Sequence, residues 1–222
     1  MGRKYRIRLI STLFVLLFVA AVPLSQSVMW PAQVGESHQS SEKTSEALRK
    51  LGQLAVKGRA PKTGYARAEF GDGWAFVGSC DTRNIILARD LKNEKVSSSC
   101  KVLSGTLDDP YTGKVIEFQR GADTSDDVQI DHVVALSNAW QTGAQQLSFS
   151  QRKALANDPL ELLAVDGKEN QNKSDGDAAT WLPSNKTFRC QYVSRQIDVK
   201  LKYQLWMTPA EKQAIERVLS AC

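Results

Sequence analysis

The chain has 222 residues, 42% of them hydrophobic, which is enough for one medium-sized domain with a buried core and an N-terminal leader. We find no internal repeat and no second domain. The formal net charge is +5, but four basic residues lie in the leader and leave 25 basic against 24 acidic residues. The overall charge therefore does not by itself indicate a nucleic-acid or membrane partner.

Residues 1–28 have the three parts of a secretory signal peptide. Basic residues at positions 3, 4, 6 and 8 precede the apolar run 9–22, and the polar stretch 23–27 follows. The apolar run is shorter than the roughly 20 residues of a bilayer-spanning helix. An uncleaved N-terminal anchor is the alternative, because no clean small-residue cleavage site is visible. We predict a secreted, extracellular monomer without stable membrane association after cleavage.

Residues 29–44 are polar and unpatterned, which predicts a linker before a domain at 45–222. An amphipathic helix is predicted over 41–57. An irregular aromatic segment follows at 70–77, and its tryptophan, Trp74, is expected in the core or at its rim. A helix capped by Asp81 is then predicted to run through Leu91, followed by a loop that reaches Cys100.

The middle of the chain predicts both strands and short helices. The expected elements, in order, are a hairpin (102–107 with 114–118), a strand (128–135), helices (136–140 and 150–156) and a strand (160–165). A long basic helix is predicted at 186–205, and Thr208-Pro209-Ala210-Glu211 forms a capping box that begins the last one. The predicted fold class is α+β.

The four cysteines, Cys80, Cys100, Cys190 and Cys222, indicate disulfides rather than zinc. They lie in an exported chain and include no C-x-x-C pair. Three pairings are possible. Proximity along the chain favours Cys80–Cys100 and Cys190–Cys222, and each bridge would stabilise the fold by roughly 3 kcal/mol.

Within the predicted strand 128–135, Asp131 and His132 stand side by side in an apolar, β-branched run. Such groups are costly to bury unless they are partnered or used in chemistry. The other histidine, His38, lies in the polar linker, so imidazole chemistry is expected at His132. From this stretch alone, an Asp–His pair held by structural hydrogen bonds is an equally good interpretation.

Further along the chain, the strand at 160–165 and an Asp-Gly turn lead to Asn170 and Lys173. An acid, an imidazole, an amide and a lysine in this order suit phosphodiester hydrolysis. That reaction needs a base for water and a cation for the developing charge. Carboxylate and amide oxygens are ligands for Mg²⁺, Mn²⁺ or Ca²⁺.

These segments together resemble the HNH (His-Me finger) nucleases. More closely, they resemble exported HNH endonuclease family proteins related to the C-terminal domain of GmrSD-type restriction endonucleases, over about residues 45–222. The resemblance rests on the stretches 80–84, 111–113, 130–136, 157–165, 170–173 and 181–186. It implies a ββα-metal core with an added β-hairpin and surrounding helices, stapled by disulfides.

By position, the resemblance implies that His132 is the general base and that Asp131 and Asn170 hold one divalent metal ion, Mg²⁺ first, with Mn²⁺ or Ca²⁺ as alternatives. Glu161 stands where the HNH pattern usually has Asn or His. Its carboxylate is predicted to accept the N–H of His132 and hold its tautomer. Alternatively, Asn157 takes the orienting role.

Lys173, Lys186 and Arg189 are candidates for phosphate contact through their charge, with solvated surface charge as the alternative reading. Neighbouring residues in a strand point to opposite faces, so Asp131 and His132 reach one phosphate only if the strand bends or ends. We therefore predict that regular pairing breaks within about one residue of His132.

The first hypothesis is a secreted, metal-dependent endonuclease, a phosphodiesterase acting on DNA, or on RNA as well. No base-reading motif is visible, so low sequence specificity is expected. The second hypothesis is a catalytically inactive secreted binding module on the same scaffold. A Ser-His-Asp hydrolase is disfavoured because no G-x-S-x-G sequence is present.

Overall fold

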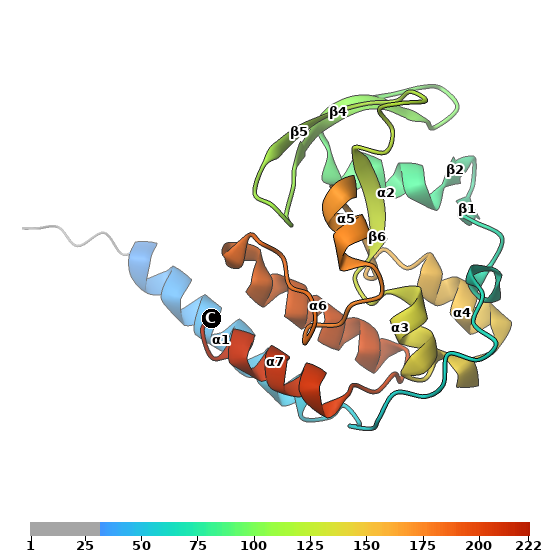
Figure 1. Ribbon diagram of the computed structural model, residues 1–222. Helices are drawn as coiled ribbons and strands as arrows, with labels where there is room; N and C mark the ends of the chain where they lie inside the picture. The colour runs from blue at the N-terminus through green and yellow to red at the C-terminus, as the bar shows by residue number, and fades with distance from the viewer. Residues whose placement is uncertain (1–31) are drawn as a thin grey trace, which may run out of the picture.

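The computed structural model describes residues 32–222, with side chains described from residue 41 onward. The predicted signal peptide, 1–28, and the side chain of His38 lie outside the described residues. The described chain is a mixed α+β fold of small antiparallel sheets surrounded by helices (Figure 1). Within 32–222, no helix combines the length and apolarity that a membrane span requires.

The helices are α1 (Ala32–Leu51), α2 (Thr82–Asp90), α3 (Leu136–Gln141), α4 (Phe149–Ala156), α5 (Gly167–Lys173), α6 (Arg189–Lys202) and α7 (Pro209–Leu219), with 3₁₀ turns η1 (Arg67–Phe70), η2 (Ala144–Gln146) and η3 (Lys186–Phe188). The strands are β1 (Phe76–Val77), β2 (Cys80–Asp81), β3 (Lys92–Val96), β4 (Val102–Asp108), β5 (Val115–Gln119), β6 (Val128–His132) and β7 (Leu162–Asp166). Within the described residues, the sheets are β1–β2, β3–β4–β5 and β6–β7.

The strand pair β6–β7 lies between two apolar cores. Ile130 and its partner Ala164 pack with α2 and the β3–β4–β5 sheet, whereas Leu163 and Val165 face the core that α1, α3, α4, α6 and α7 cover. Side chains of a strand alternate between faces, so a strand with a core on both sides needs a nearly continuous apolar sequence. Figure 1 shows α1, α6 and α7 lying together, away from the β4–β5 hairpin.

The first predicted helix differs from the structure at both ends. Helix α1 begins at Ala32 and ends at Leu51, so residues 32–40 are helical where a linker was predicted. The domain boundaries stay a prediction. Likewise, the helix predicted over 186–205 is divided into the turn η3 and helix α6.

Strand β3 (Lys92–Val96) occupies what was predicted as a loop. All five of its residues are exposed, and its sequence KNEKV has none of the apolar alternation that marks a strand. It is an edge strand, paired with β4 alone through an irregular register. Charged side chains on such an edge discourage pairing with other molecules, which accounts for the missing signal.

Both favoured disulfides are confirmed. Cys80–Cys100 joins β2 to the turn before β4, and Cys190–Cys222 joins the first turn of α6 to the last residue of the chain. The first bridge lies at the end of the segment 71–80, which follows η1 and passes beside His132. The Cys80–Cys100 disulfide therefore holds one end of the segment that contains Trp74, whose ring stacks on His132.

Candidate active site around His132

Regular pairing between β6 and β7 ends at His132, as the sequence predicted. The backbone N–H of Val133 still donates to the carbonyl of Glu161, but the next N–H, of Val134, donates to the Glu161 side chain at 3.1 Å. The chain then bends into α3. Asp131 and His132 nevertheless keep the opposite orientations of neighbouring strand residues, with Asp131 bonded to interior donors and the His132 ring at a cavity.

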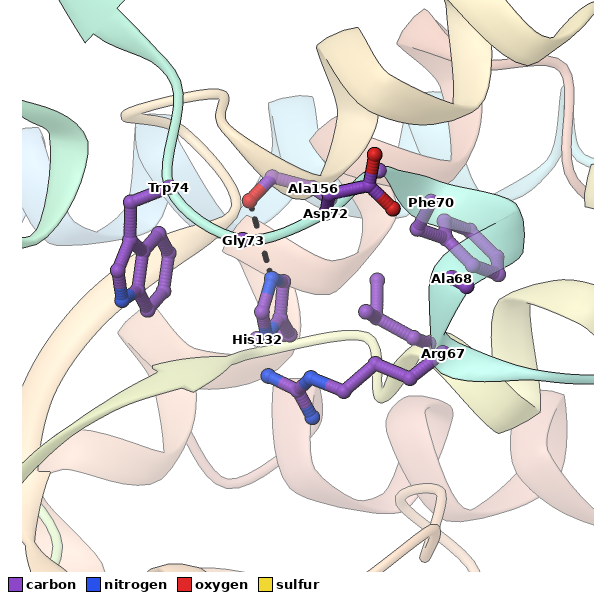
Figure 2. A pocket seen from close by; sticks show the side chains of 10 residues that line it. Arg67, Ala68, Phe70, Asp72, Gly73, Trp74, His132 and Ala156 are labelled. Carbon is purple, nitrogen blue, oxygen red and sulfur yellow. Dashed lines mark hydrogen bonds between the residues drawn. The ribbon is translucent and has the colours of Figure 1, made fainter.

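The imidazole of His132 is nearly buried, with 6% of the residue exposed. Its Nε2 lies 3.0 Å from the carbonyl oxygen of Ala156, and the ring stacks on Trp74 with the planes 4° apart (Figure 2). Burial lowers the pKa of His132 to about 3, partly offset by the bond to Ala156. The ring is therefore neutral at physiological pH. Because a carbonyl only accepts, Nε2 carries the proton and Nδ1 keeps its lone pair.

One short stretch at the end of α4 fixes both the ring and its stacking partner. Ala156 accepts from the ring, and the neighbouring Asn157 side chain accepts from the backbone N–H of Ala75 at 2.8 Å. The carbonyl of Ala75 accepts from the N–H of Thr82 at the start of α2. The Trp74 segment is thus held between α4 and α2. Asn157 bonds to this segment and not to the His132 ring.

Two cavities meet at His132. One, of 310 Å³, is lined mainly by apolar groups, including Phe70 and Trp74. The other, of 460 Å³, is polar and is lined by Asn170 and Asp175, among others. Arg67 lines both cavities, and Figure 2 shows its guanidinium extending toward the His132 ring. A ligand that bridges the two cavities would contact the imidazole and the guanidinium together.

Asp131 belongs to a buried polar cluster on the interior side of β6. The ammonium of Lys173, whose side chain is fully buried, donates to Asp131 Oδ1 at 2.9 Å and to the His132 carbonyl at 2.7 Å. The buried Tyr111 hydroxyl donates to the other oxygen, Oδ2. Burial and the neighbouring Asp131 raise the pKa of Tyr111 well above its usual value, so it stays a donor. Both carboxylate oxygens are thus bound by protein donors.

The predicted metal ligands do not form a ready ion site in this arrangement. Asn170 is half-buried and lines the polar cavity with Asp131, and its amide N–H donates to Gln129 at 2.9 Å. Both oxygens of Asp131 already face Lys173 and Tyr111. Among the residues whose side chains are described, no group of three His, Cys, Asp or Glu residues is placed to hold a metal ion. The oxygen donors suit a hard cation chemically, but their geometry does not fit one.

Comparison with known proteins supports the sequence resemblance. A family model described as "GmrSD restriction endonucleases, C-terminal domain" matches residues 81–218. The chain belongs to this family. A protein of Arthroderma benhamiae named "Uncharacterized secreted protein" is 38% identical over 184 residues, covering 82% of this chain and 86% of the relative. No solved structure matches the chain.

Membership of the GmrSD C-terminal domain family indicates a nuclease-related function and a nucleic-acid partner. The two disulfides and the secreted relative fit an extracellular location. The matched region contains His132 and the β6–β7–α5 unit, in which α5 follows β7 directly and packs against both strands. Arg67 and Trp74 precede the matched region.

Glu161, which stands where the HNH pattern usually has Asn or His, does not bond to the His132 side chain. It is fully buried, and its Oε2 accepts from the Val134 N–H, while Oε1 has no hydrogen-bond partner among the described residues. Burial raises the pKa of Glu161 well above its usual value. Glu161 therefore fixes the bend after β6 and does not hold the imidazole tautomer, because the Ala156 carbonyl takes that place.

The predicted phosphate-binding residues also differ from expectation. Lys173 is 2% exposed, so its ammonium is out of reach of a polymer in solution. Lys186 is exposed in η3, and Arg189 donates to the Pro183 carbonyl at 2.7 Å, but neither lines the His132 cavities. Arg67 was not among the residues predicted from the sequence. Its position in a 3₁₀ turn far upstream of β6 gives no local signal of proximity to His132.

Proposed function

We propose that this protein is a secreted endonuclease that hydrolyses phosphodiester bonds of DNA, or of RNA as well, with low sequence preference. The general base is His132. The β6–β7–α5 unit corresponds to the ββα core of the His-Me finger nucleases: His132 ends its first strand, and Asn170 lies on its helix. Family membership supports the class of activity, and the geometry of His132 supports the assignment of the base.

The observation that carries the proposal is the neutral, oriented imidazole beside two cavities. With Nε2 fixed by the Ala156 carbonyl, Nδ1 is the atom able to accept a proton. In the proposed step, Nδ1 takes a proton from water as the water oxygen bonds to phosphorus. The bond to the leaving oxygen breaks, and that oxygen keeps the electron pair and takes a proton from solvent water. A phosphate anion beside the ring raises the pKa of His132, which strengthens it as a base.

No step is assigned to a metal ion, because the donors around Asp131 do not fit one in this arrangement. Dependence on Mg²⁺, Mn²⁺ or Ca²⁺ stays a prediction from the family resemblance. A bound ion would supply charge stabilisation at the leaving oxygen. Metal dependence is tested directly by comparing each ion with EDTA in the same assay.

The test uses the oxidised protein with supercoiled plasmid, single-stranded DNA or RNA, and with each metal ion or EDTA. The chain offers a matched control, because His38 is its only other histidine. We expect His132→Ala to lower cleavage by at least about 100-fold, the lower range for general base catalysis, and His38→Ala to leave it unchanged.

Equal cleavage by His132→Ala and the parent protein would contradict the assignment of the base. A folded parent that cleaves no substrate under any condition would contradict the nuclease proposal. That outcome would favour the second candidate, a secreted binding module. The specific observation in its favour is that Asp131 is fully engaged by Lys173 and Tyr111.

A further inference from the structure

Arg67 differs from most arginines of the described chain in having no partner. Arg152, for example, donates to the carboxylate of Glu69 and to the carbonyl of Leu147, and Arg195 donates to three backbone carbonyls. Within the described residues, Arg67 makes no hydrogen bond, ion pair or ring contact. It is exposed at the start of η1. Its five N–H donors are therefore available to a ligand.

Arg67 lies beside the proposed base, His132, at both of the cavities that meet there. Its guanidinium extends toward the His132 ring, between the polar and the apolar cavity (Figure 2). Two acids line the polar cavity. Asp175 is engaged by Lys62 at 3.3 Å and by Ser137 at 3.2 Å. Asp131 is engaged by Lys173 and Tyr111. Asp72 lines the apolar cavity but forms no ion pair with Arg67. The positive charge of Arg67 is thus not compensated by a direct partner.

We propose that Arg67 binds the phosphate that is cleaved, donating to its non-bridging oxygens while His132 faces the attacking water. This inference rests on the proposed nuclease function and adds to it the residue that holds the substrate. A guanidinium presents parallel N–H groups that match two phosphate oxygens, and it stays charged at every physiological pH. Held beside the base, it also stabilises the charge that develops on the phosphorus oxygens.

Binding is measured in the His132→Ala background with EDTA present, so that the nucleic acid is not cut. A fluorescent single-stranded oligonucleotide is titrated at several salt concentrations. We expect Arg67→Gln to weaken binding by about tenfold or more, the effect of losing a charged hydrogen bond. The slope of log K against log salt should fall by about 0.7, the value for one phosphate contact on a single strand.

Two further variants sharpen this measurement. Arg67→Lys keeps the charge but not the parallel N–H donors of the guanidinium, so it should retain the salt slope with only part of the affinity. Arg217→Gln is the matched control, because Arg217 is exposed on α7 and lines neither cavity. It should change neither quantity. Thermal unfolding of each variant should match the parent, because Arg67 supports no other side chain.

In protein with His132 intact, Arg67→Gln should lower kcat by about 100-fold or more, as loss of a transition-state donor does. Unchanged affinity and salt slope in Arg67→Gln, with cleavage by the parent protein still present, would overturn the assignment of Arg67 alone. A parent protein that neither binds nor cleaves any nucleic acid would overturn both this inference and the proposed function.

Discussion

Replacing Lys173 with methionine should destabilise the protein strongly. The Lys173 ammonium is fully buried and donates to Asp131 Oδ1 at 2.9 Å and to the His132 carbonyl at 2.7 Å. Its removal leaves the Asp131 carboxylate, whose side chain is 6% exposed, with Tyr111 as its other donor. Breaking a buried pair from one side typically costs 3–5 kcal/mol, so we expect a loss of about 4 kcal/mol.

Urea unfolding of the oxidised protein measures this loss. Asp131→Asn should also destabilise the protein, and the double variant should be more stable than the sum of the single losses predicts, by about 2 kcal/mol. The exposed pair Lys92–Asp108 is the matched control: Lys92→Met should cost less than about 1 kcal/mol, and that loss should shrink in high salt. A loss below about 1 kcal/mol for Lys173→Met, or purely additive effects with Asp131→Asn, would refute the claim that the buried Lys173–Asp131 pair stabilises the fold.

Three other predictions follow from the site. The pKa of His132 is about 3 in the folded protein against 6.5 in the unfolded chain, so the unfolded state binds the proton first as pH falls. Stability should therefore decrease below pH 6.5, and His132→Gln should avoid about 2–3 kcal/mol of this loss between pH 7 and 4.5 in urea unfolding. Glu161→Gln keeps the acceptor for Val134 but removes a buried acid whose pKa is raised. The unfolded chain releases this proton at a lower pH than the folded protein, so the parent loses stability as pH rises. The thermal midpoint of the variant should therefore exceed that of the parent, by more at pH 8 than at pH 5. Asn157→Ala frees the Ala75 N–H, so kcat for cleavage should fall about tenfold with little change in KM, because the segment that orients the imidazole loosens.

The features that the sequence predicted well depend on local chemistry. The capping box at Thr208 and Glu211 forms as expected, because its donors and acceptors lie within one helical turn. The end of the β6–β7 pairing at His132 was predicted from the pleat of a strand and from the need for Asp131 and His132 to reach one phosphate. The pairing ends there, but the two side chains keep opposite orientations. Both disulfides pair the cysteines that are nearest in sequence.

The features that could not be predicted from the sequence depend on contacts between segments that are far apart along the chain. Lys173 lies in a polar stretch of sequence that is typical of a solvated lysine. Its burial is stable because Asp131 and Tyr111, from other elements, complete the buried cluster. Glu161 was predicted in a strand but lies in the turn just before β7, and the end of α4 already supplies the acceptor for His132 through Ala156. Arg67 has no motif around it, and the folded chain alone brings it beside the imidazole.

The most direct test of the central claim is chemical rescue of a His132→Gly variant by free imidazole. The variant leaves space for imidazole between Trp74 and the Ala156 carbonyl, where the native ring lies. We expect the variant to lose cleavage of supercoiled plasmid, and added imidazole to restore part of it with a pH dependence that follows the imidazole pKa. Cleavage by the variant at the parent rate, without imidazole, would contradict the account that His132 performs the chemistry.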